Sequence, residues 1–133
     1  CAEVLAEGTY AALFAIGSMV ETAWQVRKKL AEKGIRVTVV NARFAMPLDK
    51  NCLRKLAESH PLLVTMEENV ASGGFGEHVA AFLEEEALHT KVLRIAIPDC
   101  FVEHGSVGEL KKELGLDADS VTEKILAELP EEL

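Results

Sequence analysis

The sequence predicts a single α/β domain built on a mainly parallel sheet of about five strands. Apolar runs without polar alternation indicate strands that are covered on both faces, and amphipathic helical stretches separate these runs. The length of 133 residues and the hydrophobic content of 49% suffice for one core of ordinary size. Since no repeat, linker or low-complexity run divides the chain, we expect one domain over residues 1–133.

The first half of the chain alternates between strands and a helix. Residues 3–6 predict a short edge strand, and the wholly apolar residues 11–16 predict a central one. Ser18 and Glu21 have the spacing of a capping box for a first helix that ends at Gly34. The buried stripe of that helix is expected to contain Met19, Ala23, Val26 and Leu30, with Trp24 beside it.

Three more strands and one helix complete the predicted sheet. The β-branched residues 35–41 predict the third strand, residues 62–66 the fourth and residues 91–97 the fifth. Asp49 is expected to cap the helix between the third and fourth strands. Cys52 on that helix is interpreted as a buried apolar side chain, not as a nucleophile.

Further helices follow the fourth and fifth strands. One is expected to run from Phe75 to about Leu88, and a short one to begin at Ser106. Asp117 or Ser120 is expected to cap the last helix. Its apolar face is expected to hold Val121, Ile125 and Leu129.

Residues 65–76 combine the end of a buried strand, an acidic turn and a glycine-rich helix start. Ligands and partners of open α/β sheets bind at the carboxyl ends of strands, which makes Glu67, Glu68 and Asn69 candidate functional residues. The glycines suit close helix–sheet packing, or an anion cradle at a helix N-terminus. Packing is favoured, because Glu67, Glu68 and Glu77 would repel a phosphate.

We expect the loops at the carboxyl ends of the strands to form one functional surface. Its candidate residues are Gly17, Ser18, Met19, Arg43, Glu67, Glu68, Asn69, Asp99 and His104. Arg43 is expected to form an ion pair with Glu67 or Glu68 that fixes these loops. Asp99 and His104 are separated within a loop, and such spacing does not define the geometry of a nucleophile and its base. The histidines of the chain lack the spacing of metal ligands. No catalytic, cofactor-binding or metal-binding residue is therefore assigned.

Charge and composition narrow the class of protein. The net charge of -8 argues against binding to nucleic acid or to an anionic membrane. No apolar run is long enough to span a bilayer, and no signal peptide is visible. The three cysteines are scattered, which suits free thiols in the cytoplasm. The start at Cys1, without an initiator methionine, suggests a piece of a longer protein.

Several segments together resemble the C-terminal domain of 1-deoxy-D-xylulose-5-phosphate synthases, which belong to the transketolase superfamily. The matching segments occur in the family's order at residues 15–20, 39–44, 47–49, 64–76, 97–99, 101–102 and 104–105. Met46 and Ala96 depart from the pattern, because the family usually has lysine at the first of these positions and commonly has glycine at the second.

The resemblance implies a three-layer α/β/α domain whose five-stranded sheet has an antiparallel first strand, with the second strand between the third and fourth. It also implies a parent transferase that condenses pyruvate with glyceraldehyde 3-phosphate for isoprenoid and thiamine biosynthesis. That homodimer uses thiamine diphosphate and magnesium, which its preceding catalytic domains hold. The chain would then be a domain that docks onto those catalytic domains. By itself it would have no activity and would bind no cofactor.

Two other classes of protein remain open. One is the equivalent domain of a transketolase or of a 2-oxo-acid dehydrogenase β subunit, and the other is a free-standing regulatory or ligand-binding domain. The motifs at residues 67–69, 98–99 and 104–105 favour the synthase.

Overall fold

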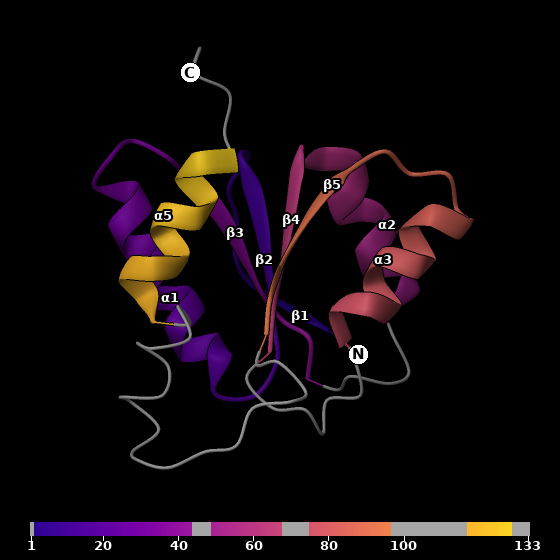
Figure 1. Cartoon of the computed structure of the whole chain (residues 1–133), viewed down its shortest axis with the longest axis horizontal. Coiled ribbons are helices and arrows are strands. Elements are labelled where there is room, and N and C mark those ends of the chain that lie inside the picture. The colour runs from indigo at the N-terminus through magenta and orange to yellow at the C-terminus, as the bar shows by residue number, and fades with distance from the viewer. Residues whose placement is uncertain (1, 44–48, 68–74, 97–116, 129–133) are drawn as a thin grey trace.

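The computed structural model describes residues 2–43, 49–67, 75–96 and 117–128. Within these ranges, one five-stranded sheet has helices on both faces, as Figure 1 shows. Its strands are β1 (Glu3–Ala6), β2 (Ala11–Ala15), β3 (Val37–Asn41), β4 (Leu62–Met66) and β5 (Lys91–Ile95). The helices are α1 (Met19–Ala31), α2 (Lys50–Ser59), α3 (Phe75–Glu85) and α5 (Ala118–Glu128).

The strand order is β1-β3-β2-β4-β5. β1 pairs antiparallel with β3, whereas the pairs of β2 with β3, β2 with β4, and β4 with β5 are parallel. The expected antiparallel first strand and the position of the second strand between the third and fourth are both confirmed. β3 begins at Val37, two residues later than predicted, because the N–H of Ile35 still bonds the Leu30 carbonyl at the end of α1 (2.9 Å).

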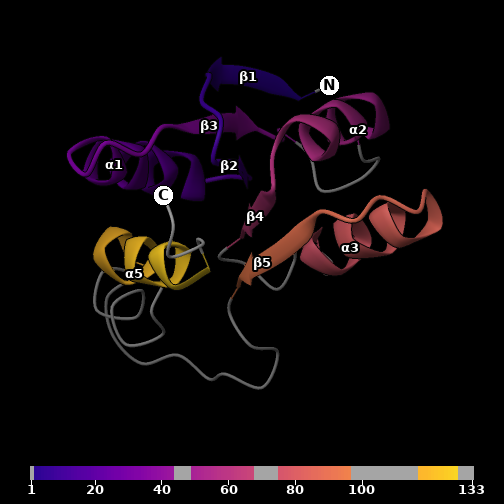
Figure 2. The same cartoon turned by 90° about the horizontal axis from the view of Figure 1, so that it is seen from above.

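Alternate side chains of the central strand β2 enter two separate cores. Leu13 packs in a cluster with residues of α1 and α5, and Phe14 packs in a second cluster with residues of α2 and α3. Figure 2 shows the two pairs of helices on opposite sides of the sheet. Every residue of β2 is consequently buried, and the three-layer α/β/α arrangement is confirmed.

Helix α1 presents its predicted stripe to the first core but lacks the predicted cap. All four stripe residues, Met19, Ala23, Val26 and Leu30, are fully buried, and Trp24 beside them is 41% exposed. Ser18 makes no side-chain cap bond, so the expected capping box is wrong. Its backbone already has helical dihedrals (φ -66°, ψ -15°), whereas a capping residue normally adopts an extended conformation.

Aspartates cap two of the other helices. Asp49 Oδ1 accepts from the N–H of Cys52 (3.0 Å), as predicted, and Asp117 Oδ2 accepts from the N–H of Ser120 at the start of α5 (3.3 Å). Cys52 is partly buried against the second core and not fully buried as predicted, and burial raises the pKa of its thiol, which disfavours a nucleophilic role. The helix expected from Ser106 lies outside the described residues, as do Leu129 and the predicted strand end at residue 97.

Candidate functional site

The carboxyl ends of the parallel strands lie together at one edge of the sheet, the lower edge in Figure 1. Backbone hydrogen bonds hold the residues that follow β2, β3 and β4. Ala42 donates to Ala15 (2.7 Å), Ile16 to Met66 (3.1 Å) and Glu67 to Ile95 (2.9 Å). The loops that leave this edge therefore begin from fixed positions. We call it the carboxyl edge and define it by Gly17, Ser18, Arg43 and Glu67.

The predicted surface residues divide into exposed and buried groups. Gly17, Ser18 and Arg43 are exposed, whereas Met19 is fully buried and Glu67 is only 5% exposed. The remaining candidates, Glu68, Asn69, Asp99 and His104, lie outside the described residues.

Glu67 turns under the first residues of α3. Its Oε2 atom accepts from the N–H of Gly76 at 2.7 Å. Burial raises the pKa of the Glu67 carboxyl, while the Gly76 N–H and the Arg94 charge act in the opposite direction. The carboxylate thus satisfies an amide that an incoming anion would need, which agrees with the sequence argument against a phosphate cradle.

Gly76 is needed because α3 approaches the sheet closely. A Cβ atom at this position would lie 2.8 Å from Thr65 Oγ1 and 2.8 Å from Arg94 Nε. Phe75, the preceding residue, is fully buried and stacks on Phe14 with 5.4 Å between ring centroids. For Gly76, the packing explanation of the glycine-rich stretch is therefore confirmed.

Arg43 has a partner that was not predicted. Its Nη2 atom lies 2.6 Å from Glu3 Oε2, and no pair with Glu67 occurs among the described residues, while the alternative partner Glu68 lies outside them. The reason is topological: β1 runs antiparallel to β3 and places Glu3 opposite Asn41, while Glu67 is turned under α3. Both partners are about half exposed, at 49% and 51%, so the pair contributes roughly 0 to 1 kcal/mol.

A second contact near this edge was also not predicted. The backbone N–H of Ala2 donates to Asp49 Oδ2 at 2.9 Å. The N–H groups of Cys52 and Ala2 lower the pKa of Asp49, so it stays ionised at neutral pH. The local pattern around Asp49 signals only a helix cap, because a contact between residues 47 positions apart leaves no trace in a short window.

The carboxyl edge offers little chemistry of its own. Among the described residues, no group of three His, Cys, Asp or Glu side chains could hold a metal ion. The guanidinium of Arg43 already faces Glu3, and the Gly76 amide of α3 faces Glu67. Within the described part of the chain, no helix is long and apolar enough to cross a membrane. The edge is suited to holding loops in place.

Replacing Glu67 with glutamine is expected to remove a pH-dependent loss of stability. The folded-state pKa of Glu67 is raised, so the folded chain binds this proton more tightly than the unfolded chain does. The free energy of unfolding therefore falls as pH rises from about 4.3, the ordinary pKa of glutamate, through the raised folded value. Glutamine keeps the acceptor for Gly76 without a charge.

Urea unfolding at a series of pH values measures this effect. Between about pH 4.3 and the raised pKa of Glu67, the free energy of unfolding of the Glu67→Gln chain should depend less on pH than that of the wild type. At pH 7 the variant should be no less stable than the wild type. Glu84→Gln, an exposed change further along α3, is the control and should keep the wild-type profile. Identical profiles for Glu67→Gln and the wild type would contradict the buried-carboxyl explanation.

The sequence matches one protein family and several curated proteins. A family model described as transketolase, C-terminal domain, matches residues 1–121. The 1-deoxy-D-xylulose-5-phosphate synthase of Lachnoclostridium phytofermentans is 54% identical over 124 residues, which cover 92% of this chain and 20% of that protein. The synthase of Shouchella clausii is 41% identical over 128 residues, which cover 96% of this chain and 20% of that protein. The chain thus spans about a fifth of the length of the curated relatives it matches.

Solved structures agree on the fold. A split-gene transketolase, described as an inactive β4 tetramer, superposes with a TM-score of 0.86 at 31% identity over 96% of this chain and 41% of that chain. A transketolase variant from Pichia stipitis gives a TM-score of 0.65 at 15% identity over 95% of this chain and 17% of that chain. The second likeness concerns the fold alone.

Proposed function

Since this chain belongs to the transketolase C-terminal domain family, we propose that it is the C-terminal docking domain of a 1-deoxy-D-xylulose-5-phosphate synthase. The parent enzyme would condense pyruvate with glyceraldehyde 3-phosphate, releasing carbon dioxide, as a cytoplasmic homodimer. The observation that carries the proposal is the 54% identity to such a synthase over 92% of this chain. Because only 20% of that relative is covered, the activity belongs to the whole protein.

The direction of β1 supports the carboxyl edge as the docking surface. β1 is antiparallel to β3, so its first residue, Glu3, lies beside Asn41 at the end of β3. The N-terminus accordingly lies near the lower edge in Figure 1, and the C-terminal end of α5 points to the opposite edge. A domain that precedes residue 2 would arrive beside Gly17, Arg43 and Glu67.

The described residues do not fit a bound thiamine diphosphate. A diphosphate with magnesium needs free cationic or amide donors and a group of carboxylates. At the carboxyl edge, Arg43 is paired with Glu3, the Gly76 amide is occupied by Glu67, and the described residues contain no metal-holding group. We therefore assign thiamine diphosphate and magnesium to the preceding domains and no catalytic step to this chain.

Two measurements test this assignment. The full-length enzyme is expected to form 1-deoxy-D-xylulose 5-phosphate from pyruvate and glyceraldehyde 3-phosphate in the presence of thiamine diphosphate and magnesium. The 133-residue chain alone is expected to show no turnover and no heat of binding in calorimetric titration with both cofactors. Saturable binding by the chain alone in the micromolar range would refute the assignment, and a full-length enzyme inactive with these substrates would refute the proposed reaction.

The main alternative is the equivalent domain of a transketolase. The fold supports it equally, because the split-gene transketolase superposes with a TM-score of 0.86. Sequence identity separates the two, since that transketolase is 31% identical to the chain and the synthases reach 41% and 54%. Turnover of a ketose phosphate donor in place of pyruvate by the full-length enzyme would favour the transketolase.

A further inference from the structure

The first described residues of the chain, Ala2 and Glu3, are both held by long-range contacts. The backbone N–H of Ala2 donates to Asp49 Oδ2 (2.9 Å), and the carboxylate of Glu3 accepts from Arg43 Nη2 (2.6 Å). The two partners lie 47 and 40 residues further along the sequence, at the start of α2 and just after β3. Long-range contacts from two different elements therefore converge on the entrance.

Asp49 and Arg43 are each held by a further hydrogen bond. The second oxygen of Asp49 caps α2 through the N–H of Cys52 (3.0 Å), which ties the entrance to the helix layer. Arg43 adopts a left-handed backbone conformation (φ 65°), and its own N–H bonds Asn41 Oδ1 (2.9 Å). Residues other than glycine avoid this conformation, and such outliers persist where the surroundings fix them, often with a functional reason.

We propose that these two contacts, Ala2 with Asp49 and Glu3 with Arg43, form an entrance clamp that sets the direction in which the preceding domain meets the carboxyl edge. The inference rests on the proposed function, which supplies that domain. β1 is an edge strand of four residues, and the domains of one chain move relative to one another unless the interface between them is large and hydrophobic. Fixing the first residues reduces the orientations to be searched and favours docking. Asp49 and Arg43 are thus positioning residues and not catalytic ones.

Two aspartate caps in the chain allow a matched test in the full-length enzyme. Asp49→Asn replaces one of the two acceptor oxygens by an NH2 donor, so either the N–H of Ala2 or that of Cys52 faces a donor in place of its acceptor. Asp117→Asn makes the same change at the start of α5, where the two carboxylate oxygens accept from the N–H and the hydroxyl of Ser120. The readouts are the rate of proteinase K cleavage at the junction before residue 2, and kcat and KM for the synthase reaction.

We expect Asp49→Asn to accelerate junction cleavage roughly threefold to tenfold, the factor set by one lost hydrogen bond, and to lower kcat. Asp117→Asn should leave both readouts at the wild-type level. Glu3→Lys should also accelerate cleavage through repulsion, and the double variant Glu3→Lys, Arg43→Glu should slow it again.

Equal cleavage rates in the Asp49→Asn and Asp117→Asn enzymes would overturn the clamp, because they would reduce Asp49 to an ordinary helix cap. Failure of the charge swap to slow cleavage would overturn the role of Arg43. A wild-type enzyme without synthase activity would instead refute the proposed function, and the cleavage comparison would still decide whether the clamp exists.

Discussion

Replacing Gly8 with alanine is expected to lower the free energy of unfolding by about 3 kcal/mol or more. A Cβ atom on Gly8 would lie 2.5 Å from the backbone N of Val37, and 2.6 Å from the carbonyl carbons of Arg36 and Val37. These are backbone atoms at the start of β3, which has strands on both sides, so they cannot turn aside as a flexible side chain can.

The turn that contains Gly8 cannot move away either. Its N–H donates to Thr38 Oγ1 (2.9 Å), whose hydroxyl donates back to the Gly8 carbonyl (3.1 Å). The Nε2 atom of the buried His60 lies 3.2 Å from the same carbonyl oxygen. Relieving the clash would break these part-buried hydrogen bonds, so steric and polar costs add.

Gly17→Ala is the matched control for Gly8→Ala. Gly17 has a positive φ of 65°, but a Cβ there would meet nothing within 4 Å, so only backbone strain of about 1–2 kcal/mol is expected. Urea unfolding followed by circular dichroism measures both changes. A loss for Gly8→Ala no larger than that for Gly17→Ala would contradict the close packing of the turn on β3.

Replacing Phe75 with alanine is expected to cost about 3–5 kcal/mol, the usual range for a fully buried phenylalanine. The side chain is 0% exposed and stacks on Phe14 of the central strand at an interplanar angle of 18°. Because Phe75 is the first residue of α3, its loss should also loosen the approach of Gly76 to Glu67. The helix start would then lose its position on the carboxyl edge.

Trp24→Ala is the control for Phe75→Ala. Trp24 is the larger aromatic side chain, but it is 41% exposed and its described ring contact is the guanidinium of Arg27 at 5.9 Å. A loss of about 1 kcal/mol or less is expected in the 133-residue chain. Comparable losses for the two variants, measured by urea unfolding, would show that α3 is not anchored through Phe75.

Much of the fold could be predicted because its signals are local. Residues 62–66 are apolar without alternation, and β4 has those bounds and is wholly buried. Gly34 supplied a helix stop and indeed has a positive φ of 78° after α1. The third helix ends at Glu85, earlier than the predicted Leu88, because Ala87 takes the positive φ (56°) that usually marks a glycine. No residue type in the sequence announces that stop.

The site was harder to predict because its contacts are long-range. The pairing of Arg43 with Glu3 depends on which strand lies beside β3, and the position of Ala2 depends on the direction of β1. Glu67 was predicted as a loop residue at a strand end, which holds for its backbone. The orientation of its side chain depends on the close approach of α3, which the sequence could only suggest through Gly76.

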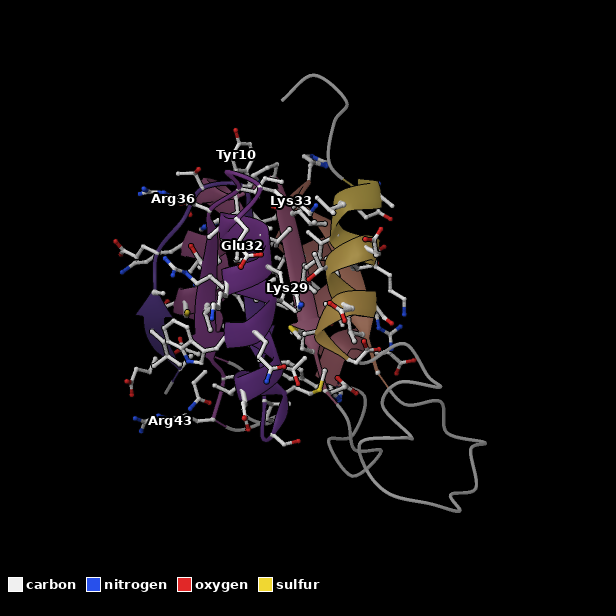
Figure 3. The ribbon with its side chains drawn as sticks, turned by 90° about the vertical axis from the view of Figure 1, so that its left-hand side faces the viewer. Tyr10, Lys29, Glu32, Lys33, Arg36 and Arg43 are labelled. Carbon is white, nitrogen blue, oxygen red and sulfur yellow. The ribbon has the colours of Figure 1, made fainter. Side chains whose placement is uncertain are left out.

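Hydrogen exchange, compared between the 133-residue chain alone and the full-length enzyme, tests most directly whether the domain docks through its carboxyl edge. Figure 3 places Arg43 at one end of the sheet and Tyr10, Lys33 and Arg36 at the other. If the carboxyl edge docks, peptides that contain Gly17 or Arg43 exchange more slowly in the full-length enzyme, and peptides with Tyr10 or Lys33 keep their rates. Protection confined to the peptides with Tyr10 or Lys33, with unchanged exchange at Gly17 and Arg43, would contradict the account.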